Sequence, residues 1–355
     1  MKSLSMTILM LFAICAVIFA CVAIIGCTTA THTAKKRENT GKAILGISPG
    51  KKEITVQAVT ADDSPVQVEG CTVTELPSGE EIFLEALGDA VVLKGNITEL
   101  DCSSNELTAL DVRGLTALQT LYCDNNRLSS LDVRQLTALQ WLKCYNNQLS
   151  VLHVQDLTSL RLLYCDDNRL TSLNLHGLFG LWFLHCDNNQ LTALNVQGLT
   201  SLQVLNCDNN QLTTLNVQGL ASLWFLRCHD NQLTSLDLKG VTALQTLDCY
   251  NNRLTVLDIH GLSRLAGLYC SRNRLKEHAL IQIINSLPER RTDEETEAVF
   301  YTEEDNRSEG NYTDWKSSDG LQAAIKTARA KNWTLYKQVG GEDFEELEVV
   351  DSVRD

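Results

Sequence analysis

The sequence is short of basic residues. It contains 30 Lys and Arg against 44 Asp and Glu, which gives a formal net charge of -14 at pH 7. A protein that binds nucleic acid usually presents clustered Lys and Arg to the phosphate backbone. No such cluster occurs in the part of the chain that we expect to be ordered. We therefore predict no nucleic-acid partner.

The sequence also lacks the motifs of common catalytic sites. It contains no nucleophile elbow, no phosphate-binding loop and no H-E-x-x-H zinc motif. The histidines of the central region are scattered and do not cluster: His153, His176, His185, His229 and His260. We therefore predict no enzymatic activity, no catalytic residue and no cofactor.

One long apolar run is present, Met6–Ile25, and it is followed by "IIGC", which ends at Cys27. This pattern predicts an export signal over residues 1–26. The aliphatic pair before Gly-Cys resembles the lipobox of bacterial lipoproteins, which makes Cys27 the predicted lipidation site and Cys21 the weaker choice. The alternative is an uncleaved membrane anchor, since about 20 apolar residues can span a bilayer.

The next segments are a polar tether over residues 27–42 and a small β region over residues 43–96. The β region contains alternating stretches such as "EITVQAV", "EEIFLEAL" and "AVVLKG", separated by turn sequences such as "ADDSP" and "LPSGE". Four or five short strands are expected there. They would lead directly into the central region and cover its open edge.

Residues 97–275 repeat with a period of 21 residues, nine times. The unit "LQTLYCDNNRLSSLDVRQLTA", Leu118–Ala138, matches the leucine-rich-repeat signature L-x-x-L-x-C-x-x-N-x-L. We predict a mainly β solenoid whose repeats each add one strand to a parallel, concave sheet. The return path of each repeat is too short for a full helix, so short extended segments are expected there.

Two residue types recur in every repeat. The asparagine column is predicted to bond backbone groups that the turns leave unpaired. The cysteine column, Cys102 to Cys270, lies two residues after an inward leucine and should also point inward. We interpret these cysteines as small core side chains. Disulfides between neighbouring repeats and metal ligation are the alternatives; Cβ spacing and the absence of C-x-x-C clusters disfavour them.

The outward positions of the strands are free to vary, and they contain large apolar and aromatic residues. Such a patch with a polar rim predicts protein binding, although aromatic residues also suit any sheet face. The predicted protein-binding residues are Tyr122, Trp141, Leu162, Tyr164, Trp182, Phe183, His185, Val204, Trp224, Phe225 and Arg227. The apolar members of the column from Trp141 to Phe225 are expected to stand exposed.

A third outward column contains Asp124, Asp166, Asp187 and Asp208. These carboxylates could bind a cation, but solvated turn residues are the favoured interpretation. We predict no metal site.

The pattern ends after Leu275, and residues 276–340 predict an α/β cap that covers the last repeat. Its parts are a helix in "EHALIQIINSLPERR", a strand in "AVFYT", a helix in "DGLQAAIKTARAKN" and the segment "WTLYKQ". Residues 341–355 are acidic and are expected to fray.

The repeats resemble those of the treponemal-type bacterial leucine-rich-repeat surface lipoprotein family. The resemblance rests on "LTALDVRGLTALQTLYCDNNRL" and its copies, on the entry "VVLKGNITELDCSSNELTAL" and on the exit "AAIKTARAKNWTLYK". It covers about Val68 to Lys337. The acidic stretch "TDEETEAVFYTEEDNRSEGNYTDW" departs from the family pattern and leaves the shape of the cap open.

The resemblance implies an exported, often lipid-anchored protein that adheres to host matrix or to other bacteria, without catalysis or cofactor. We therefore predict a lipid-anchored protein of the bacterial cell envelope, exposed on the outer membrane. Its concave sheet would bind a host matrix protein or a bacterial surface protein. The alternative is a periplasmic structural or assembly lipoprotein that uses the same face.

Overall fold

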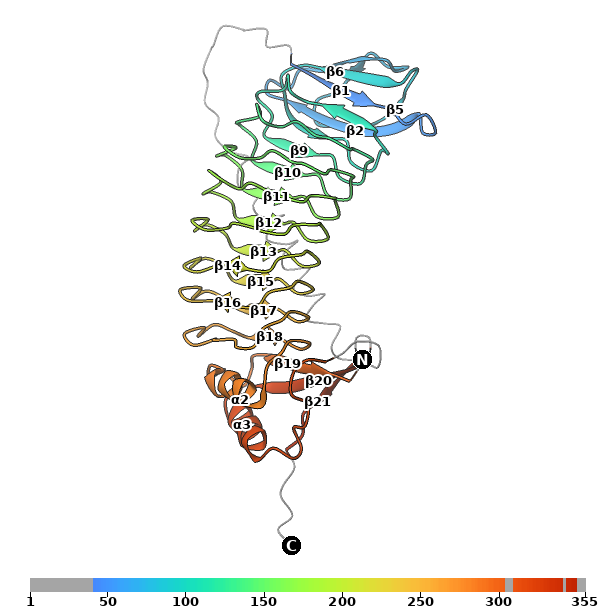
Figure 1. Ribbon diagram of the computed structural model, residues 1–355. Helices are drawn as coiled ribbons and strands as arrows, with labels where there is room; N and C mark the ends of the chain where they lie inside the picture. Colours follow the sequence, from blue (N-terminus) through green and yellow to red (C-terminus); the bar gives the residue numbers. More distant parts are fainter. Residues whose placement is uncertain (1–40, 304–308, 341–342, 350–355) are drawn as a thin grey trace.

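The computed structural model describes residues 41–303, 309–340 and 343–349. The predicted signal peptide, Cys27 and most of the tether lie outside the described residues. Within the described ranges, no helix is both long enough and apolar enough to cross a membrane. The described chain forms one elongated stack, with a β region at one end and two helices at the other (Figure 1).

The repeats form a solenoid in which each contributes one short strand to a parallel sheet. From one repeat to the next, each strand residue pairs with the residue 21 positions further along, as Leu121 does with Leu142. Parallel neighbours of this kind are about 4.8 Å apart. The strands are β7 (Ile97–Asp101), β9 (Thr120–Tyr122), β10 (Trp141–Lys143), β11 (Leu162–Tyr164), β12 (Phe183–His185), β13 (Val204–Asn206), β15 (Phe225–Arg227), β17 (Thr246–Asp248) and β18 (Gly267–Tyr269).

The return paths consist of turns and short extended segments, as predicted from their length. Three of them contain brief strands: β8 (Ala109–Asp111), β14 (Leu215–Asn216) and β16 (Leu236–Asp237). The two described helices both lie after the last repeat. The predicted mainly β, leucine-rich-repeat solenoid is therefore confirmed.

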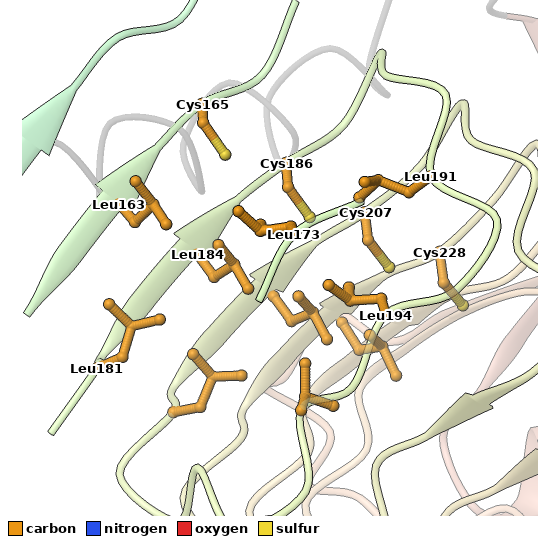
Figure 2. Close-up of a cluster of buried hydrophobic side chains, with 14 of the residues drawn as sticks. Leu163, Cys165, Leu173, Leu181, Leu184, Cys186, Leu191, Leu194, Cys207 and Cys228 are labelled. Atoms are coloured by element: carbon orange, nitrogen blue, oxygen red, sulfur yellow. The ribbon is translucent and has the colours of Figure 1, made fainter. Parts of the chain in front are cut away.

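The cysteines of the repeats line the core beside the leucines. Cys165 and Cys186 are fully buried, and Figure 2 shows their sulfur atoms in one row with Cys207 and Cys228, between the leucine side chains. All ten cysteines of the described residues are free thiols. Burial raises the pKa of Cys186 well above its ordinary value. The packing interpretation is confirmed, and the disulfide alternative is wrong for these residues.

The asparagine column joins each repeat to the one before it. Asn189 Nδ2 donates to the carbonyl oxygens of Cys186 at 3.2 Å and of Cys165, one repeat earlier, at 3.1 Å. Its Oδ1 accepts from the Leu170 amide at 2.9 Å. The preceding residue, Asn188, has a φ of 50°, the left-handed conformation that asparagine tolerates. The structural role predicted for this column is confirmed.

The N-terminal β region extends the sheet of the solenoid. Its strands are β1 (Lys42–Gly46), β2 (Glu53–Thr60), β3 (Val66–Glu69), β4 (Glu75–Leu76), β5 (Glu81–Glu85) and β6 (Ala90–Lys94). β2 pairs antiparallel with β7 of the first repeat and with β5, while the other strands form a second sheet in the order β4-β3-β6-β1-β8. The edge strand of the first repeat is therefore covered, as predicted.

The C-terminal region continues the same sheet at the other end. It contains α2 (Glu277–Ser286), β19 (Glu297–Thr302), α3 (Asp319–Ala330), β20 (Thr334–Gly340) and β21 (Asp343–Glu346). β19 pairs parallel with β18, and β20 pairs parallel with β19. The α/β cap is thus present, and its acidic stretch supplies a strand of the main sheet.

The expectation of a frayed end from residue 341 is wrong at β21. This strand pairs antiparallel with β20, and Lys337 Nζ lies 3.0 Å from a carboxylate oxygen of Glu345. Phe344 meets the ring of Tyr336 edge to face. An unpaired strand edge is a hazard that proteins usually cover, and here the acidic segment itself covers β20.

Candidate functional site on the concave face

The concave face is the face of the parallel sheet that turns away from the core. In each three-residue strand the middle leucine points inward, so the first and third residues lie on the concave face. On β12 these are Phe183 and His185, on either side of the fully buried Leu184. All predicted binding residues lie on these strands or directly before them.

An apolar cluster occupies the centre of the concave face, separate from the core. Leu162, Phe183 and Val204 form it, and five neighbours pack against it: Trp141, Tyr164, Trp182, Trp224 and Phe225. We name these eight residues the concave apolar cluster. It brings together eight of the eleven predicted binding residues.

The expected exposure of the apolar column is wrong for three of its members. Leu162 and Val204 are fully buried, and Phe183 is 5% exposed. Register pairing places Leu162 directly beside Trp141 and Phe183, so large side chains on adjacent strands pack against one another. Only the flanking residues Trp141 and Phe225 are partly exposed.

Cationic side chains lie over the aromatic rings at the edges of this face. The Arg161 guanidinium lies 5.8 Å from the ring centre of Trp182. Lys143 Nζ lies 4.4 Å from the ring centre of Tyr122, nearer the N-terminal end of the sheet. Such contacts stabilise the ring positions by about 0.5–1 kcal/mol each at exposed sites. Sequence reasoning missed both, although the cations occur one repeat away from their aromatic partners.

A row of polar residues runs beside the concave apolar cluster, from the ends of the strands into the turns. We name it the polar stripe, and its members are Asp166, His185, Asp187, Asp208, Arg227, His229 and Asp248. His185 stacks on Tyr164 with ring centres 4.2 Å apart. Two strands further on, Arg227 Nε lies 3.5 Å from Asp248 Oδ2. The predicted residues His185 and Arg227 therefore both lie on this stripe, two strands apart.

The interpretation of the aspartate column as solvated turn residues is wrong, because three of its four members are buried and Asp166 is half-buried. Asp124, Asp187 and Asp208 are between 5% and 8% exposed. In-register stacking sets each of these side chains between the turns of two neighbouring repeats. Burial, followed by the charges of Asp166 and Asp208, raises the pKa of Asp187 to about 8.

His229 lies in the same stripe and is surrounded by carboxylates. Its Nε2 lies 3.2 Å from Asp208 Oδ2, and its Nδ1 lies 2.9 Å from Asp230 Oδ2. Its ring stacks on Tyr250 at 4.3 Å. Burial lowers the pKa of His229, but the hydrogen bond to Asp230 and the charges of Asp248 and Asp208 outweigh it, and the pKa is raised.

The in-register strands, the asparagine column and the leucine and cysteine core together define a leucine-rich-repeat solenoid. Proteins of this class generally mediate protein–protein interactions, and stacked repeats present an extended surface for that purpose. The fold is typically a non-enzymatic interaction scaffold.

Comparison with protein families agrees with this class, and the repeats are leucine-rich repeats. A family described as "Leucine Rich repeats (2 copies)" matches residues 95–135. A second, described as "Leucine Rich Repeat", matches residues 201–223 and 243–265. No curated protein gives a significant match to the sequence.

Several solved structures are similar to this chain, and one of them, an internalin, shows the same fold. An internalin (inlF) from Listeria monocytogenes is 18% identical, with a TM-score of 0.52, over 69% of this chain and 82% of that chain. The functional domain of InlJ from Listeria monocytogenes, which includes a cysteine ladder, is 27% identical, with a TM-score of 0.45, over 61% and 56%. YopM, a leucine-rich effector protein from Yersinia pestis, is 28% identical, with a TM-score of 0.43, over 55% and 50%. The match thus spans about half the length of InlJ and of YopM.

Proposed function

We propose that this chain is an exported, lipid-anchored leucine-rich-repeat protein of the treponemal-type surface lipoprotein family. In this proposal the concave face binds a host matrix protein or a bacterial surface protein, and the protein acts in adhesion. The apolar run before Cys27 supports the anchor. The repeat sequences support the family.

The concave apolar cluster is the observation that carries the binding proposal. Nothing in the solenoid core requires aromatic residues on this face, yet Trp141, Trp182, Trp224 and Phe225 gather there and remain partly exposed. Partly exposed Trp residues with a charged neighbour such as Arg161 are typical of binding hot spots. A protein partner would cover the remaining apolar area and could pair with the polar stripe.

Adhesion of cells that express the full chain tests this proposal. We expect such cells to adhere to surfaces coated with extracellular-matrix proteins or with other bacteria, and cells without the protein to adhere less. The double variant Trp141→Gln and Phe225→Gln should lower adhesion at least about tenfold, because hot-spot side chains each contribute 2 kcal/mol or more, roughly. Both residues are partly exposed, so the fold should survive, which circular dichroism checks.

The matched control is Phe179→Gln. Phe179 is 60% exposed and lies outside the strands of the concave face, in the turn before β12. It should leave adhesion unchanged. Equal losses in both variants, or full adhesion in the double variant with its fold intact, would contradict binding by the concave face.

The anchor and the location are tested separately. Mass spectrometry of the mature protein should find a lipidated N-terminal Cys27, and an intact Met1 would contradict lipoprotein processing. Protease added to intact cells should digest the repeats. Protection of the repeats would favour the periplasmic structural or assembly lipoprotein instead.

A further inference from the structure

Three metal-ligating side chains converge within the polar stripe. Asp166 lies two residues after β11, His185 ends β12, and Asp187 lies two residues after β12. Each offers one ligand atom, and these atoms all lie within 4.8 Å of one another. We name them the Asp166–His185–Asp187 cluster.

The fold holds this cluster in place without a ligand. Asp166 and Asp187 occupy the same position in consecutive repeats, and the Asp167 amide donates to the Asp187 carbonyl oxygen at 3.1 Å, which ties their turns together. Tyr164 stacks on His185 and fixes the plane of its ring. The donor atoms are therefore positioned by backbone pairing and ring packing, as a binding site requires.

The cluster contains buried donor atoms without partners. Among the described residues, Asp166 Oδ1, His185 Nε2 and Asp187 Oδ1 are inaccessible to solvent and accept or donate no hydrogen bond. Asp187 as a whole is only 8% exposed. Buried polar atoms are almost always paired in folded proteins. The other oxygen of Asp187, Oδ2, accepts from Asn188 Nδ2 at 3.0 Å. Three unpaired buried atoms within one cluster therefore indicate a missing ligand.

The chemistry of these side chains fits a cation as that ligand. An imidazole nitrogen and two carboxylate oxygens lie within 4.8 Å of one another. Imidazole and carboxylate groups are common metal ligands in proteins. A divalent ion between them would supply the partner that these buried atoms lack.

We propose that Asp166, His185 and Asp187 bind a first-row divalent transition-metal ion of the Mn²⁺ or Zn²⁺ type. Imidazole nitrogen suits such ions, and carboxylate oxygens complete a mixed set that Ca²⁺, which takes oxygen ligands only, does not prefer. Ligand bonds of about 2.0–2.2 Å place donor atoms about 3–4 Å apart. Small side-chain rotations would close the present spacing to these values, and water would fill the remaining positions.

Other repeats show why the site is confined to this one. Asp124 occupies the same column, but its next repeat supplies Lys143 and Tyr145 where this one has His185 and Asp187. His229 follows Asp208, but both of its ring nitrogens already lie against carboxylates. Among the described residues, a histidine grouped with two aspartates that each have one unpaired buried oxygen occurs only in the Asp166–His185–Asp187 cluster.

Mn²⁺ titration of the full-length protein, followed by electron paramagnetic resonance of free Mn²⁺, tests the proposal. Mn²⁺ is chosen because the nine buried thiols of the repeats would compete for softer ions if any protein unfolded. We expect one Mn²⁺ to bind per chain. His185→Gln and Asp187→Asn should each weaken binding at least about tenfold, and Asp124→Asn should not change it. Circular dichroism confirms that each variant is folded.

Competition identifies the class of ion. Zn²⁺ at equal concentration should displace Mn²⁺, whereas Ca²⁺ at equal concentration should not. The proposal is overturned if folded wild-type protein binds no stoichiometric Mn²⁺, if Asp124→Asn weakens binding as much as Asp187→Asn, or if Ca²⁺ displaces Mn²⁺ as well as Zn²⁺ does. This inference does not depend on the proposed partner or on the anchor.

Discussion

Asn189 bonds the backbone of Cys165, 24 residues earlier, with its side-chain nitrogen 3.1 Å from the Cys165 carbonyl oxygen. The bond crosses from one repeat to the one before it. Its equivalents recur along the solenoid, as at Asn126 and Asn252. Neighbouring repeats are therefore joined by side-chain bonds as well as by the strand ladder.

Asn189→Ala should destabilise the solenoid by about 1–3 kcal/mol, because it leaves buried carbonyl and amide groups unpaired. The free energy of unfolding from urea denaturation measures this. Gln190→Ala, at the exposed next position, is the control and should change stability by less than about 0.5 kcal/mol. Equal effects of the two substitutions would refute the bonding role of the column.

The cysteines should be unreactive in the native protein and reactive after unfolding. The thiolate is the reacting form, and burial raises the pKa of the thiols in the repeats far above their ordinary value. Maleimide labelling followed by mass spectrometry should show no modification of the ten described cysteines in native protein. In denaturant without reductant all ten should react. A shortfall there would reveal disulfides.

His229→Gln should destabilise the protein more at pH 6 than at pH 9. The folded pKa of His229 is raised, while the unfolded value is near 6.5. The charged histidine therefore contributes its full stabilisation below about pH 6.5, and this is lost as pH rises through the folded pKa. Denaturation curves at both pH values measure the difference. His153→Gln, which replaces an exposed histidine, is the control substitution.

Asn311→Ala should loosen the C-terminal cap without unfolding the repeats. Asn311 Nδ2 donates to the carbonyl oxygens of Cys270 at 2.9 Å and Phe300 at 2.8 Å, and its Oδ1 accepts from the Leu275 amide. It therefore continues the asparagine column into the cap. Hydrogen exchange should increase in β19 and α2 and stay unchanged in β11. Uniform exchange along the chain would contradict a local effect.

The fold of the repeats was predictable because the same residue pattern recurs in every repeat. Leu184 and Cys186 are two residues apart, and this spacing identifies the inward side of a strand. The nine copies define the period as 21 residues. Asn311 was not predictable, since it follows Asn273 by 38 residues and no longer obeys the period of 21. Only the folded cap brings it to the end of the column.

The sequence predicted which residues lie on the proposed binding face, but it did not predict how deeply each of them is buried. Strand alternation placed Trp141, Phe183 and Phe225 on one face. It could not show that Phe183 would be buried by its neighbours while Trp141 stays partly exposed, because burial depends on how side chains from adjacent strands pack. The predicted binding role of these residues stays a prediction.

The sequence by itself determined the period, the inward leucines and cysteines, the asparagine bonds and the caps, because these follow from repeat spacing and local backbone chemistry. The tertiary structure alone decided the surroundings of the outward side chains. In the sequence, Asp166 and Asp187 cannot be distinguished from ordinary turn residues. Because the repeats stack in register, both side chains lie close to His185 and lose much of their contact with solvent. Desolvation by a neighbouring repeat cannot be recognised in the sequence of a single repeat.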